Sequence, residues 1–155
     1  MTKLLLSLHV IVAIVAVGPV TVAASLFPRT AREAAAAPGD AAPRASLRTL
    51  HRICRVYALL ALLVPAFGLA TAGAMGVLGD AWLTASIFIT GAAGFLLAGF
   101  VLPLQERILR ELDGAPAAAV AATSARLAMT VGLFNLLWAT VTVLMIVRPG
   151  STTGA

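Results

Sequence analysis

The stretch LLLSLHVIVAIVAVGPVTVAASLF, which runs from Leu4 to Phe27, decides the fold. It contains no acidic residue, lysine or arginine, and His9 is its only side chain that titrates near neutral pH. The hydrocarbon core of a bilayer is about 30 Å thick, and about 20 apolar residues cross it as an α-helix. The stretch therefore predicts a transmembrane helix.

The same stretch also imitates a secretory signal peptide. Lys3 precedes it, and the small residues Ala23, Ala24 and Ser25 lie near its end. However, its apolar run is longer than the roughly 7–15 residues of such a signal, and Pro19 interrupts it. These features favour a retained helix over a cleaved signal.

Three further apolar stretches follow, at about residues 54–78, 81–102 and 127–147. Their apolar residues do not alternate with polar ones, and four segments are too few for a transmembrane barrel. We therefore predict an all-α fold, a transmembrane four-helix bundle that forms one integral membrane domain over residues 1–155. The tight turn at Gly79 and Asp80 makes the second and third spans an antiparallel hairpin.

Composition agrees with a membrane protein. Hydrophobic residues make up 61% of the chain and charged residues only 11%, whereas a soluble domain is about half apolar and about a quarter charged. The net charge of +5 could indicate a nucleic-acid partner. The arginines gather between the apolar stretches, as the positive-inside rule predicts, so the expected partner is the lipid bilayer and not nucleic acid.

Most of the basic residues flank or fill two connections, residues 28–53 and 103–126. Nine of the 11 lysines and arginines lie there, so we expect both connections to be cytoplasmic and both termini to lie outside a bacterial cell membrane. The first connection is expected to be a long loop whose end becomes helical. In the second, Leu104, Ile108 and Leu112 recur at helical spacing between charges and predict a short interfacial helix.

Prolines and small residues inside the spans predict how the helices pack. Pro19 and Pro65 are expected to kink their helices. Small residues three or four apart predict close contacts inside the bundle, with a homodimer seam or a contact in a larger membrane complex as the alternative. These residues are Gly68, Ala72 and Gly76; Ala66, Ala70 and Ala74; and Gly91, Gly94 and Ala98.

Polar residues are few at membrane depth. Asn135 lies near the middle of the fourth span and needs a hydrogen-bond partner. We favour a structural bond between helices, but Asn135 and Thr142 could also line a polar pocket in a small carrier. No Asp, Glu, Lys or Arg lies within a span core, which argues against an ion-coupled transporter. Trp82 is expected either to pack in the bundle or to lie in the aromatic belt at the outer membrane surface, for which it is well placed.

His9 is the candidate for cofactor chemistry, because histidine can ligate haem or copper. His51 is expected about 20 Å deeper, so one metal cannot bind both histidines of one chain. Met75 and Met145 are expected near the depth of His9, and a His/Met set suits haem b or Cu(I). The favoured alternative is structural, with methionines filling the core and His9 capping a carbonyl.

Two motifs carry a family resemblance. The opening KLLLSLHV at residues 3–10, with Gly18 and Pro19 after it, and the ending VLMIVRPG at residues 143–150 resemble the domain of unknown function 2269 family. Those proteins are predicted bacterial integral membrane proteins. The resemblance covers nearly the whole chain and implies a four-helix membrane protein without an assigned activity.

The Leu-His opening also resembles the copper resistance protein D family and the four-span haem-binding protoporphyrinogen oxidases. That resemblance implies that His9 is a metal or haem ligand. The chain departs from these families in having Val17, Gly18 and Pro19 where Trp-Gly-Gly often follows, and in lacking an intramembrane lysine.

The expected function is that of a non-enzymatic accessory or interaction subunit in the membrane. Two alternatives stay open. One is a haem- or copper-binding membrane protein that uses His9 with Met75 or Met145. The other is a small membrane carrier.

Overall fold

The computed structural model describes residues 2–150, and within them the chain is almost entirely helical. Its elements are α1 (Thr2–Ala36), α2 (Ala41–Leu60), α3 (Leu63–Met75), α4 (Ala81–Leu96), the π-helix η1 (Leu97–Val101), α5 (Leu102–Glu111) and α6 (Ala117–Val147).

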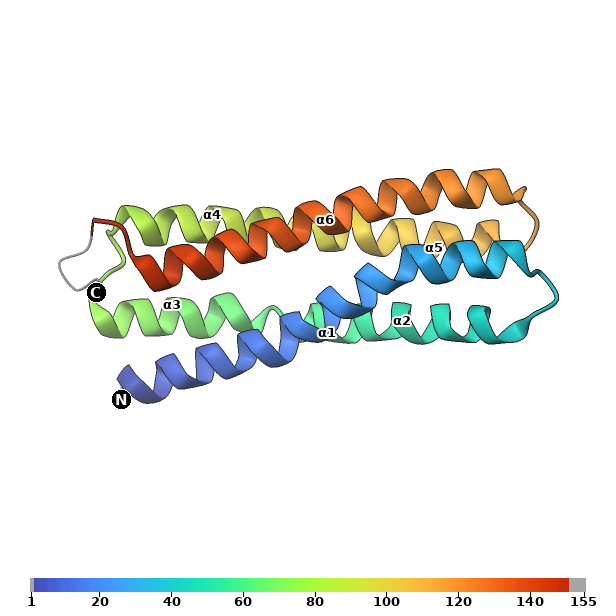
Figure 1. Ribbon diagram of the computed structural model, residues 1–155. Coiled ribbons are helices and arrows are strands. Elements are labelled where there is room, and N and C mark those ends of the chain that lie inside the picture. The colour runs from blue at the N-terminus through green and yellow to red at the C-terminus, as the bar shows by residue number, and fades with distance from the viewer. Residues whose placement is uncertain (1, 151–155) are drawn as a thin grey trace.

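These elements form four antiparallel rods, because α2 leads directly into α3, and α4 leads through η1 into α5 (Figure 1). All four rods are long and apolar enough to cross a membrane. Large apolar side chains point outward, and Phe88 and Ile146 are 74% and 73% exposed. An apolar exterior of this kind suits lipid and not water, so the predicted all-α transmembrane bundle is confirmed.

The turns and helix ends gather at two opposite ends of the bundle. The start of α1, the turn between α3 and α4, and the end of α6 lie together at what we call the terminal end (Figure 1). The turn between α1 and α2 and the turn between α5 and α6 lie at the opposite end, which we call the arginine end.

The two expected loops are mostly helix, which corrects the predicted connections. Residues 28–36 continue α1 and residues 41–53 begin α2, so only residues 37–40 form the turn. Residues 117–126 likewise begin α6. The alanine-rich segments have high helix propensity, and Asp40 caps α2 by accepting a hydrogen bond from the Ala42 N–H at 2.9 Å.

The helix predicted over residues 104–112 exists as α5, but it is not a separate interfacial helix. It continues the rod of α4 (Figure 1). Pro103 explains the π-helix before it, because a proline cannot donate a hydrogen bond to the carbonyl of Gly99. In the wider turn of η1, the Leu102 N–H bonds to the Leu97 carbonyl. The rod therefore stays helical in spite of the missing hydrogen bond.

The prolines act differently from one another. Pro19 lies inside α1 without ending it. Before Pro65 the helix breaks at Ala61 and Leu62, which separate α2 from α3. Pro65 has no N–H that could donate to the carbonyl of Ala61. This carbonyl accepts a hydrogen bond from the Val64 N–H at 3.1 Å instead.

The central rod is α1, which packs against α2, α3 and α6. Its buried residues recur every three or four positions, as a helix that packs on its neighbours requires. They are Ala16, Val20, Ala23, Ala24, Phe27, Pro28, Ala31 and Ala34. Because most of them are alanines, neighbouring backbones can approach closely.

This alanine face of α1 is not among the three small-residue faces that the sequence predicts. Of those, only the first packs inside the bundle, with Gly68 against His9 and Ala72 buried. The other two faces are exposed in the single chain, which corrects the predicted contacts. They are Ala66, Ala70 and Ala74, and Gly91, Gly94 and Ala98.

Candidate functional site

His9 lies between α1 and α3, and its ring is held from two directions. Its Nδ1 is 3.0 Å from the carbonyl oxygen of Val64. The ring also lies so close to Gly68 that a Cβ built there would be 3.0 Å from the His9 Cε1. Because a carbonyl only accepts, Nδ1 carries the proton of this hydrogen bond, and Nε2 of the neutral ring keeps a free lone pair.

The two methionines expected beside His9 lie nearer the terminal end. Met145 packs against a small cluster of Ala72, Trp82 and Leu83. Met75 ends α3, seven residues beyond Gly68 and therefore about 10 Å farther along the helix. The structure thus places His9 one to two turns below both methionines, and the His/Met ligand set stays a prediction.

Trp82 is buried, so its ring packs within the bundle, which is the first of its two predicted roles. Its Nε1–H donates to the Asp80 Oδ2 at 2.9 Å, and the Arg148 guanidinium lies 5.6 Å from the centroid of its ring. A guanidinium over an indole face is a favourable cation–π arrangement. These contacts tie the end of α6 to the start of α4.

Asn135 finds a partner that the sequence did not indicate. Its Nδ2 donates to the Ser25 Oγ at 3.2 Å, which links α6 to α1. Thr142 is exposed and donates to the Trp138 carbonyl of its own helix at 2.9 Å. Asn135 and Thr142 therefore bond in different directions and do not form one polar pocket, whereas the structural bond predicted for Asn135 is present.

The main polar network of the interior lies near the arginine end, between α2 and α5. The His51 Nδ1–H donates to the Gln105 Oε1 at 2.9 Å, and the Gln105 Nε2 donates to the Cys54 Sγ at 3.4 Å. Gln105 and Cys54 are fully buried. On its other side, the His51 Nε2 is 3.6 Å from the Glu106 Oε1.

Sequence reasoning missed this network, because Gln105 lies in a charged segment and its neighbour Glu106 is exposed. The available signal was helical spacing, since Val101, Gln105 and Ile108 lie on one face and are all buried. The separation of the two histidines is confirmed, because His51 bonds to α5 and His9 to α3.

No described group of three His, Cys, Asp or Glu side chains within residues 2–150 has the arrangement of a metal site. The network around Gln105 combines an amide, an imidazole and a thiol, and each bonds to another member. Its chemistry is that of a polar link between two helices.

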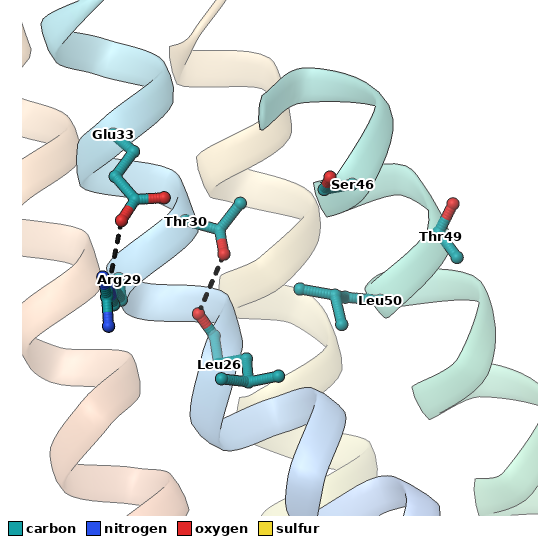
Figure 2. A pocket seen from close by; sticks show the side chains of 7 residues that line it. All are labelled: Leu26, Arg29, Thr30, Glu33, Ser46, Thr49 and Leu50. Atoms are coloured by element: carbon teal, nitrogen blue, oxygen red, sulfur yellow. Dashed lines mark hydrogen bonds and ion pairs between the residues drawn. The ribbon is translucent and has the colours of Figure 1, made fainter. Parts of the chain in front are cut away.

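A shallow groove of about 480 Å³ runs between α1 and α2 near the arginine end (Figure 2). Its lining consists of Leu26, Arg29, Thr30, Glu33, Ser46, Thr49 and Leu50. Arg29 pairs with Glu33 at 2.9 Å, and the Thr30 hydroxyl donates to the Leu26 carbonyl at 3.2 Å, as the dashed lines show. The Ser46 and Thr49 hydroxyls also donate to carbonyls of their own helix. The groove is therefore a surface whose polar groups already have partners.

Comparison of the chain with protein-family models, with curated proteins and with solved structures finds no match. The family resemblance of the two terminal motifs therefore stays a prediction.

Proposed function

We propose that the chain is a non-enzymatic accessory subunit of a cell-membrane complex, with its arginine end in the cytoplasm and both termini outside. One observation carries this proposal. The four rods do not stop where their apolar segments stop, but continue as a packed, basic extension of the bundle.

The extension is substantial. Residues 29–36 of α1 and residues 41–53 of α2 project about 12 and 20 Å beyond the apolar segments. The core of the bundle continues into the extension, since Ala34, Leu47 and Ile108 are fully buried. The extension is therefore folded and presents a defined surface, which a pair of irregular loops would not.

The surface of this extension is basic. The arginine end holds nine arginines and five acidic residues. Its exposed arginines are Arg29, Arg32, Arg48, Arg52, Arg55, Arg107, Arg110 and Arg126. A fixed positive surface attracts an acidic surface of another protein and orients it on approach.

The membrane part of the bundle supports a role as a subunit. α4 packs mainly against α6. Gly91, Gly94 and Ala98 of its rod are exposed. Small residues are those through which membrane helices associate, so this side of the rod suits the helix of a partner.

The test is the size of the particle that contains the chain in its own cells. After mild crosslinking and extraction in a neutral detergent, we expect a complex larger than the single chain. Arg52→Gln with Arg55→Gln should reduce its yield several-fold. Lys3→Gln, which removes one charge at the terminal end, serves as the matched control and should leave the yield unchanged. A chain that is monomeric before and after crosslinking would disprove the proposal.

A second candidate function is the binding of haem b or copper through His9. The hydrogen bond from Nδ1 to the Val64 carbonyl favours it, because metal-ligating histidines usually donate their other ring N–H to such an acceptor. Protein purified from haem-replete cells should then show a Soret band that His9→Ala removes and His51→Ala retains. The absence of both the band and stoichiometric copper would dismiss this candidate.

A further inference from the structure

We propose that the arginine end carries an oxyanion-binding site of the phosphate class between α2 and α5, built from Arg44, Arg48 and Arg110. The site is a pocket of about 160 Å³, a volume that is large enough for a phosphate group. Its lining consists of Arg44, Arg48, Leu109, Arg110, Leu112 and Asp113.

Arg44 is held in place at the wall of the pocket. Its Nη1 donates to the Asp113 Oδ1 at 3.1 Å, and its Nη2 donates to the Leu112 carbonyl at 2.5 Å. Its side chain is nevertheless 27% exposed, so a ligand in the pocket can still reach it.

Arg48 and Arg110 add positive charge to the lining of the pocket. Arg48 lies one helical turn after Arg44 on α2, and Arg110 lies in the last turn of α5. Neither makes an ion pair within residues 2–150. The lining therefore contains three arginines and one carboxylate, that of Asp113, and the pocket keeps an excess of positive charge. Guanidinium forks match the oxygens of phosphate in geometry as well as in charge.

A purely structural role does not account for all of this. By bonding to the Leu112 carbonyl, Arg44 caps the C-terminal end of α5, where a positive charge is favourable. That role does not explain why Arg48 and Arg110 border the same pocket, where like charges repel one another. A bound dianion would offset this repulsion.

A phosphate group reaches this pocket either on a soluble ester or on a lipid headgroup. Arg44 lies ten residues before Cys54, where the apolar part of the second rod begins, and this separation corresponds to about 15 Å. The headgroup layer on each side of a bilayer is only about 5–8 Å thick. The depth of the pocket favours the soluble source, and the experiment separates the two.

The experiment follows thermal unfolding of the full chain in dodecyl maltoside, using the exposure of the buried Cys54 thiol to a fluorogenic maleimide. Inorganic phosphate at constant ionic strength should raise the unfolding midpoint in a saturable manner, because a ligand that binds only the folded state stabilises it. Chloride at the same ionic strength should not. Arg48→Gln with Arg110→Gln should abolish the shift.

The control variant is Arg32→Gln with Arg126→Gln, which removes two exposed arginines outside the pocket and should retain the full shift. Arg44 is left unchanged, because replacing it would also remove the cap on α5 and could alter the unfolding midpoint for that separate reason. If wild-type protein shows no shift with phosphate, or if the Arg48/Arg110 variant retains it, the site does not exist. Because the assay uses the purified chain alone, its result does not depend on the proposed membrane partner.

A second arm identifies the source of the phosphate group. The chain is reconstituted into phosphatidylcholine vesicles with and without phosphatidylglycerol. If the soluble ester is the ligand, inorganic phosphate should raise the midpoint equally in both vesicles. If the lipid is the ligand, phosphatidylglycerol should itself raise the midpoint and cancel the effect of added phosphate, in wild type and not in the Arg48/Arg110 variant.

Discussion

At the scale of single residues, Gln105 is the polar group on which the arginine end depends most. It is fully buried and bonds both His51 and Cys54 across the contact between α2 and α5. Gln105→Leu keeps the volume but leaves the His51 donor without its acceptor. We expect it to lower the free energy of unfolding by about 1–3 kcal/mol.

Cys54 reactivity during denaturation provides the measurement, since the thiol is buried in the folded chain. Glu106→Gln, which changes an exposed neighbour of Gln105, is the matched control and should shift the midpoint little. Equal midpoints for the Gln105 variant and wild type would show that the network contributes nothing to stability.

The contact between His9 and Gly68 gives a second prediction at this scale. Gly68→Ala puts a Cβ at 3.0 Å from the His9 ring, so the ring or one helix must move. Overpacking of this kind costs about 1–3 kcal/mol. Gly91→Ala, where a Cβ meets open space, should cost nothing in the same thermal unfolding assay.

A double-mutant cycle then shows whether the cost of Gly68→Ala arises at His9. In the background of His9→Ala the substitution should become nearly neutral, because the clashing ring is gone. A cost that persists in that background would place the strain elsewhere.

Among the residues, the sequence predicted a bond from His9 to a carbonyl as the structural alternative but could not indicate which carbonyl. That partner is the main-chain carbonyl of Val64, which every residue type possesses. The same holds for Asn135: its need for a bond was predictable, but Ser25 became its partner only because α1 crosses α6 at that point.

At the scale of elements, the caps decide where helices begin. Asp40 separates α1 from α2 and accepts the Ala42 N–H at the start of α2. Asp40→Ala should lower the free energy of unfolding by about 1 kcal/mol, the usual worth of an N-cap. Glu33→Gln removes only one partner of an exposed ion pair, which is worth about 0.3–0.5 kcal/mol, and is the control.

Chemical denaturation of the two variants in detergent would compare these values, with helix content measured by circular dichroism. If Asp40→Ala were no worse than Glu33→Gln, the start of α2 would not depend on this cap.

The apolar segments were predictable from the sequence, whereas the ends of the helices were not. Hydropathy located the four apolar segments well, because the bilayer imposes their composition. It placed the helix ends wrongly, because a helix can continue in water. Residues 29–36 and 117–126 are rich in alanine, and they form helix on account of propensity and not of hydropathy. Likewise, Pro103 is the one feature of the sequence that indicates the π-helix η1.

At the scale of the whole molecule, the asymmetry of charge gives a prediction about orientation. With the arginine end in the cytoplasm, Ser46→Cys should react with an impermeant maleimide only after the membrane is opened. Gly79→Cys should react in intact cells. Both positions are exposed, and the native Cys54 is buried and gives no background. The opposite labelling pattern would reverse the proposed topology.

The central position of α1 has a consequence for how the bundle is made. α1 precedes α2, α3 and α6 in the chain, and it is the rod against which all three pack. The ribosome therefore delivers the scaffold before the elements that assemble on it, and each later helix that packs on α1 finds its docking face already in the membrane. Biosynthesis in this order spares the chain a search among alternative pairings of four similar apolar helices.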